Sequence, residues 1–160
     1  MLKKFFAAAF AAIFLVMLAG CSEYTMTAED LAIQNSIKGY WRADDSTGYN
    51  SYDEEGNPTN ILVAEFTSDF TYFIHQCDFV SGYTTTYDPI SYSFKNEKFM
   101  VIVEGVPSYA KVSVSSDGQT MQWITDSQTE VYRRIDEKTA RLFGIPEYTG
   151  ENTGSEDTEE

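Results

Sequence analysis

The chain has 160 residues, a formal net charge of −14 and a pI of about 4.3. This acidity argues against a nucleic-acid partner, because no basic stripe is present that could neutralise phosphates. The length is that of a single domain that can bury a sizeable core.

The first segment has the layout of a secretory leader, with two lysines ahead of an apolar stretch at residues 5–18. That stretch is shorter than the ~20 residues that a membrane-spanning helix needs. The run Leu18-Ala19-Gly20-Cys21 resembles the lipobox of bacterial lipoproteins. The resemblance implies cleavage of residues 1–20 and attachment of a diacylglyceryl group to Cys21. The mature protein would then be extracytoplasmic and held on the membrane of the cell envelope by its lipid.

A short helix is expected after the lipidated linker, residues 21–27. Thr27 is followed three residues later by Asp30, which is the pattern of a capping box. Leu31, Ala32, Ile33 and Ile37 supply an apolar side, so we predict a helix at about 28–36 that ends near Gly39.

From Gly39 onward the hydrophobic period changes to two residues, which indicates strands. A first strand begins at Tyr40-Trp41 and leads into a long polar loop at 43–59. The later strands are expected at 61–67, 70–79, 83–94 with an interruption at Asp88-Pro89, 99–104, 110–114, 121–123 and 130–135. Asp117-Gly118 is a strong hairpin signal between two of them.

About eight short strands joined by tight turns predict an all-β, antiparallel, up-and-down meander. Closure into a barrel would remove its two edges, and such a barrel has room for side chains or one small ligand. An open sandwich is the alternative architecture. We expect the barrel domain to span residues 28–146 and to be followed by a disordered acidic tail at 147–160, which is rich in Glu, Asp, Gly and Ser.

Gly39-Tyr40-Trp41, placed directly after the short helix, resembles the Gly-x-Trp signature of the lipocalins. The resemblance is to small bacterial lipocalin-like lipoproteins and covers roughly residues 28–135. It implies that Trp41 closes the base of the barrel and that an arginine of the last strand packs across it. Arg133 and Arg134 point to opposite faces, and we favour Arg134 because it shares a face with Tyr132.

No catalytic or metal site is expected. His75 and Cys77 face the same way on one strand, but a catalytic pair would also need an orienting group, and none is evident. One histidine and one remaining cysteine do not make a zinc site, and the acidic loop lacks the spacing of a calcium loop. We therefore predict a protein without enzyme activity, cofactor or metal, in which Cys77 is a buried apolar residue.

The aromatic content of 15% suits the wall of a ligand cavity. The candidate wall residues, all on predicted strands, are Phe66, Tyr72, Tyr92, Phe94, Val112, Val114, Met121 and Trp123. Ligand entry is expected opposite the Trp41 base, where the loop at 43–59 should lie and be mobile. The main hypothesis is a lipid-anchored carrier of a small hydrophobic ligand. The alternative is a filled barrel that docks another envelope protein or a glycan.

Overall fold

The computed structural model describes residues 26–103 and 105–148. Helix α2 (Ala28–Ile37) comes first, and the short helix α3 (Glu137–Leu142) comes last. The turn η1 (Asp45–Thr47) follows the first strand. The strands are β1 (Gly39–Ala43), β2 (Ser51–Tyr52), β3 (Pro58–Phe66), β4 (Thr71–Asp78), β5 (Tyr83–Thr86), β6 (Ile90–Lys95), β7 (Lys98–Val103), β8 (Val106–Val114), β9 (Thr120–Ile124) and β10 (Thr129–Ile135).

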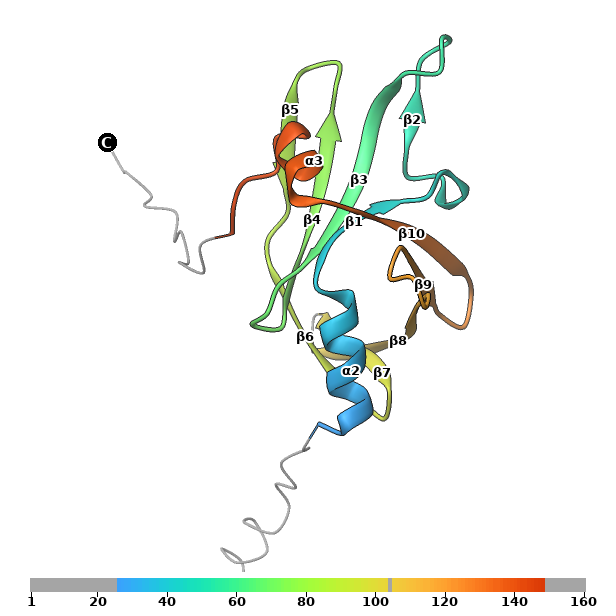
Figure 1. The fold of residues 1–160 in the computed structure, drawn as a ribbon, viewed down its shortest axis with the longest axis vertical. Helices are drawn as coiled ribbons and strands as arrows, with labels where there is room; N and C mark the ends of the chain where they lie inside the picture. The colour runs from blue at the N-terminus through green and yellow to red at the C-terminus, as the bar shows by residue number, and fades with distance from the viewer. Residues whose placement is uncertain (1–25, 104, 149–160) are drawn as a thin grey trace, which may run out of the picture.

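Eight antiparallel strands close into a barrel in the order β1-β3-β4-β6-β7-β8-β9-β10, and β10 pairs back onto β1. The two short strands extend the wall, β2 along β3 and β5 along β4. Figure 1 shows α2 at one end of the strands and α3 beside β4 and β5. The predicted fold class, a closed antiparallel barrel behind a short helix, is therefore confirmed, and the open sandwich is excluded.

The expected interruption at Asp88-Pro89 is also present. β5 and β6 both pair with β4, so together they follow the path of one strand that is broken at these two residues. Proline has no N–H to give to a ladder, which explains the break. The predicted hairpin joins β8 to β9, and its Gly118 has a φ of 71°, the left-handed region that glycine adopts without strain.

Helix α2 begins with the predicted capping box. The Thr27 hydroxyl accepts from the Asp30 amide at 3.0 Å, and the Asp30 carboxylate accepts from the Thr27 amide at 3.0 Å. Ile37 is buried against the barrel. Leu31 is 44% exposed, so its expected place on the apolar side of the helix is wrong.

Two further features differ from the sequence-based expectation. The loop at 43–59 carries η1 and β2, and Asn50 pins it by donating to Ala43 O at 2.7 Å and accepting from the Leu62 amide at 3.1 Å. Helix α3 was not predicted, because six residues carry too little periodicity; its one signal is Asp136, which caps the Thr139 amide at 2.7 Å.

Helix α3 and the chain after it cover the outer face of β3 and β4. Ala140 and Ile145 pack there with Ile61, Val63 and Cys77, so Cys77 is buried as expected. Among the described residues, no helix is both long and apolar enough to cross a membrane. The leader, Cys21 and the expected tail from residue 149 onward lie outside the described residues.

Candidate ligand-binding site inside the barrel

Trp41 closes the base of the barrel. Its side chain is 0% exposed, and its indole N–H donates to Ile37 O at 2.6 Å, which ties β1 to the end of α2. The guanidinium carbon of Arg134 lies 4.1 Å from the centre of the indole ring. Arg134 also donates to three backbone carbonyls at 2.7, 2.7 and 2.5 Å, those of Gly118, Lys38 and Ser36. One arginine therefore joins the helix end, the β8–β9 hairpin and the tryptophan.

The register of β1 and β10 decides which arginine meets Trp41. Trp41 pairs directly with Arg134, whereas Arg133 faces outward and holds Asp44 at 3.0 Å. Gly39 makes room for this contact: its φ is 107°, and a Cβ there would lie 3.2 Å from Arg134 Nη1. A side chain at position 39 would be strained by its backbone and crowded by the guanidinium.

The eight candidate wall residues all belong to one hydrophobic cluster inside the barrel. Five of them pack so closely that they are under 5% exposed, namely Phe66, Tyr92, Phe94, Val112 and Met121. These five fill the interior rather than line an open surface, because aromatic rings stack directly on one another there. Tyr92 and Phe99, for example, stack with ring centres 4.9 Å apart.

Tyr72 and Trp123 are the partly exposed aromatic residues of this cluster that carry a hydrogen-bond donor; Phe70 is the third partly exposed aromatic residue. The Tyr72 ring stacks on Phe66 at 5.6 Å, and the Trp123 ring meets Phe99 edge-on at 4.4 Å. Neither the Tyr72 hydroxyl nor the Trp123 indole N–H bonds to another described residue, although every buried polar side-chain atom described has a partner. Both donors therefore reach solvent at the edge of the aromatic floor. Burial raises the pKa of Tyr72, so its hydroxyl stays protonated at neutral pH.

A carboxylate stands beside Trp123. Trp123 pairs across the strands with Glu130, whose carboxylate accepts from Tyr132 at 2.7 Å and from Tyr49 at 2.5 Å. Burial and the neighbouring Glu130 raise the pKa of Tyr132 well above its usual range. Tyr49 belongs to the loop at 43–59, so that loop reaches the barrel end away from Trp41. Sequence reasoning missed this cluster of Glu130, Tyr132 and Tyr49. The available signal was that Glu130 and Tyr132 lie two residues apart on one strand and therefore share a face.

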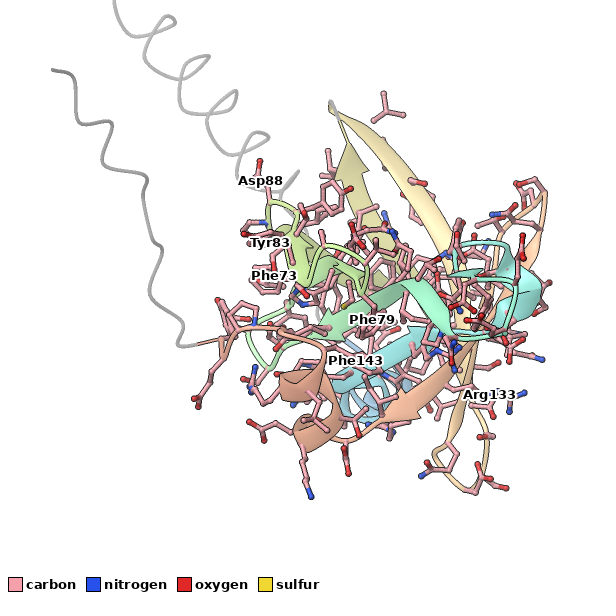
Figure 2. The ribbon with its side chains drawn as sticks, turned by 90° about the horizontal axis from the view of Figure 1, so that it is seen from above. Phe73, Phe79, Tyr83, Asp88, Arg133 and Phe143 are labelled. Carbon is pink, nitrogen blue, oxygen red and sulfur yellow. The ribbon has the colours of Figure 1, made fainter. Side chains whose placement is uncertain are left out.

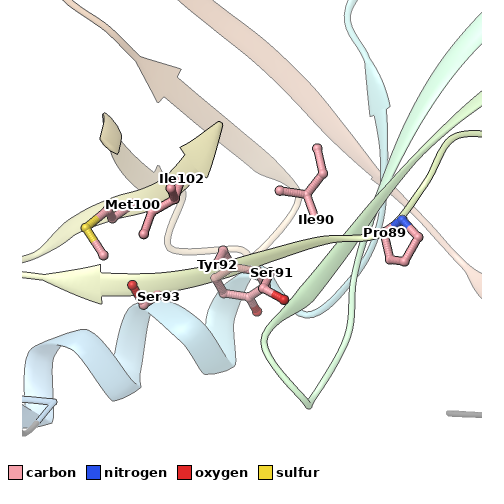
Figure 3. Close-up of a pocket in the computed structure, with 7 residues that line it drawn as sticks. All are labelled: Pro89, Ile90, Ser91, Tyr92, Ser93, Met100 and Ile102. Atoms are coloured by element: carbon pink, nitrogen blue, oxygen red, sulfur yellow. The ribbon is translucent and has the colours of Figure 1, made fainter. Parts of the chain in front are cut away.

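Two open grooves lie on the described surface. One, of about 630 Å³, runs over β6 and β7 outside the barrel, between Ser93, Met100, Ile102 and Pro89 (Figure 3). The other, also of about 630 Å³, lies between α2 and β8 and is lined by Ile33, Val112, Val114 and Arg134. Val112 and Val114 thus border a groove beside the helix. They do not border the barrel end away from Trp41, which we call the mouth.

His75 lies outside the barrel, in the core under α3. Its side chain is 1% exposed; Nε2 lies 3.0 Å from Glu65 and Nδ1 lies 2.9 Å from the Thr86 hydroxyl. The orienting group that the sequence did not reveal is therefore Glu65, which the β3–β4 register places on the same face as His75, two residues along from Val63, the direct partner of His75. Phe73 stacks on His75, and Tyr148 packs on Phe73 and donates to Asp69. Both ring nitrogens of His75 are therefore engaged, and its ring is covered by Phe73.

The fold and the interior together define a class: a closed eight-stranded antiparallel barrel, compatible with a lipocalin-like fold, with an aromatic interior closed at one end. No protein-family model matches the chain, and no curated protein matches it significantly.

Proposed function

We propose that this protein is a membrane-tethered, extracytoplasmic binding protein whose lipocalin-like barrel holds a small hydrophobic ligand at its mouth and performs no chemistry. The observation that carries the proposal is that two hydrogen-bond donors without a partner among the described residues, Tyr72 and Trp123, belong to the aromatic cluster inside the barrel. Ligand sites are typically apolar surfaces with a few polar groups that fix orientation.

The charge at the mouth narrows the ligand class. Glu130 lies beside Trp123, and the whole chain carries a net charge of −14. Arg134, which packs on the interior, is engaged at the base with Trp41 and three carbonyls. A carboxylate ligand would meet a like charge there and, among the residues that the structure describes, no free cation. The ligand should therefore be an uncharged hydrophobe with an oxygen that accepts hydrogen bonds.

We expect the chain from residue 22 onward, produced without its leader, to bind retinol at least tenfold more tightly than retinoic acid. The two share one apolar skeleton, and only the second carries a carboxylate. Quenching of tryptophan fluorescence measures both affinities, because Trp123 lies at the site. Saturable binding of retinoic acid alone, or of neither compound nor any other uncharged hydrophobe, would contradict the proposal.

A matched pair of variants tests whether the ligand binds at Tyr72 rather than elsewhere on the surface. Tyr72→Phe keeps the ring that stacks on Phe66 and removes only the hydroxyl, so it should weaken binding about five- to tenfold, the value of one hydrogen bond. Tyr109→Phe makes the same change on an exposed tyrosine of β8 and should leave binding unchanged. If the two variants changed the ligand affinity equally, the mouth of the barrel would not be the binding site.

The tether is the second part of the proposal, and it rests on the lipobox-like run that ends at Cys21. Two acyl chains give stable membrane attachment, whereas a domain without them has little to hold it. Cys21→Ser should move the protein from the membrane fraction to the soluble fraction. Retention of the variant on membranes after a high-salt wash would show that something other than lipid anchors it.

A docking function is the second candidate, and a specific surface favours it. The β7–β8 hairpin exposes Ile102 and Val106, and the groove in Figure 3 lies beside them on the outer wall. Native mass spectrometry of the protein purified from its own membranes distinguishes the two functions. A bound small molecule supports the carrier; a protein that carries no small molecule and copurifies with another protein or a glycan supports docking.

A further inference from the structure

The free edge of β5 has a sequence that reads the same in both directions. Residues 83–87 are Tyr-Thr-Thr-Thr-Tyr, and β5 pairs only with β4, at one end of the sheet order. Tyr83 and Tyr87 are 76% and 53% exposed. Figure 2 shows Tyr83 and Asp88 on the same side of the molecule, away from Arg133.

The hydrogen-bond phase of this edge is symmetric about Thr85. The Tyr87 amide donates to Ile74 O at 3.0 Å, and in antiparallel pairs the bonded residues alternate. Tyr83, Thr85 and Tyr87 therefore bond toward β4, while the backbone groups of Thr84 and Thr86 point to the free edge. A second bond agrees with this alternation. The Phe79 amide donates to Thr59 O at 3.0 Å on the β3 side of β4, so the residues of β4 that bond toward β5 are the even-numbered ones.

We propose that this edge pairs with a second copy of the chain, antiparallel and about a two-fold axis at Thr85. Thr84 then meets the partner's Thr86 in two reciprocal pairs of backbone hydrogen bonds. Tyr83 lies opposite the partner's Tyr87, and Thr85 lies opposite the partner's Thr85. Aromatic pairs and Thr–Thr pairs are favourable cross-strand neighbours. A two-fold interface of this kind closes at a dimer.

The charge of the segment favours a copy of the same chain as the occupant. Native sheets usually guard a free edge with lysine or an inward-pointing charge, but residues 79–87 carry no charged side chain in a protein of net charge −14. Two acidic copies can therefore meet here without facing like charges. Two acids flank the segment. Asp88, which follows Tyr87, would lie opposite the partner's uncharged Gly82, and Asp78 is turned into its own hairpin, where its carboxylate accepts from the Val80 and Ser81 amides at 2.8 and 3.1 Å.

The test uses the full chain in the membranes of bacteria that express it, with one cysteine introduced at a time beside the native Cys21 and the buried Cys77, and a mild oxidant. Directly opposed residues at a non-hydrogen-bonded position have Cα atoms about 4.5 Å apart, within the range of a disulfide. Thr85→Cys should form a disulfide-linked dimer at least tenfold more than Val80→Cys. Val80 is the matched control because it is 79% exposed on the same hairpin but lies off the axis.

The register provides an independent check. Tyr83→Cys and Tyr87→Cys chains expressed together should link to each other, and each expressed alone should not, because like positions would lie about 13 Å apart along the strands. Equal linking by Val80→Cys, linking of Tyr83→Cys to itself, or no linking at either position overturns the proposal. A Thr85→Cys adduct with a different protein also overturns it, since the edge then serves another partner.

Discussion

Trp41→Ala is expected to lower the free energy of unfolding by about 3–5 kcal/mol, the usual loss for a fully buried aromatic side chain. The indole is 0% exposed, and the ring supports Arg134 at 4.1 Å. Its removal leaves a cavity at the closed end, deprives Ile37 O of its donor at 2.6 Å and uncovers the guanidinium. Urea denaturation of the chain without its leader measures the loss.

Trp41→Phe is the graded control. It retains a ring beneath the guanidinium and loses the bond to Ile37, so its cost should be clearly smaller, about 1–2 kcal/mol. The difference between the two variants separates the contribution of packing from that of the hydrogen bond. An unchanged urea midpoint for Trp41→Ala would mean that the base of the barrel does not depend on this residue.

Arg134→Met should cost about 2–4 kcal/mol, because it removes charge-assisted hydrogen bonds to three carbonyls while keeping most of the apolar stem. Those carbonyls belong to the end of α2, the residue after it and the β8–β9 hairpin, so the variant also loosens the contact between helix and barrel. The urea midpoint of the same unlipidated chain gives the value.

The adjacent arginine is the matched control for this experiment. Arg133→Met changes the same residue type one position earlier, where the side chain is 57% exposed and pairs with Asp44 at 3.0 Å. Exposed ion pairs contribute under about 1 kcal/mol. If Arg133→Met destabilised the protein as much as Arg134→Met, the hydrogen bonds of Arg134 to the three carbonyls would not be the source of the effect.

The strands follow from local information. Val112 and Val114 alternate with polar residues, Asp117-Gly118 marks a hairpin, and Pro89 breaks the strand between β5 and β6. These features act through the pleat, the turn and the missing N–H of proline, and each operates within a few residues. The choice of Arg134 over Arg133 has the same origin, because side chains of a strand alternate between its faces.

Contacts between distant parts of the chain could not be predicted from such local patterns. Glu65 and His75 meet because the β3–β4 register places them on one face, and Tyr49 meets Glu130 because the first loop folds back over the mouth. Leu31 is exposed although it is apolar, because the barrel covers only one side of α2. Such outcomes depend on which surfaces the closed barrel leaves uncovered.

The sequence by itself therefore determined the all-β class, the helix with its cap, the turns and the residues at the closed base, since propensity, turn chemistry and alternation are local. Only the tertiary structure decided which of the aromatic residues are packed and which reach solvent. Phe66 and Tyr72 have similar patterns of neighbours in the sequence. In the structure the Phe66 side chain is buried, whereas the Tyr72 side chain stacked on it is partly exposed. The free edge of β5 is decided in the same way, because an edge exists only once the neighbouring strands have found their partners.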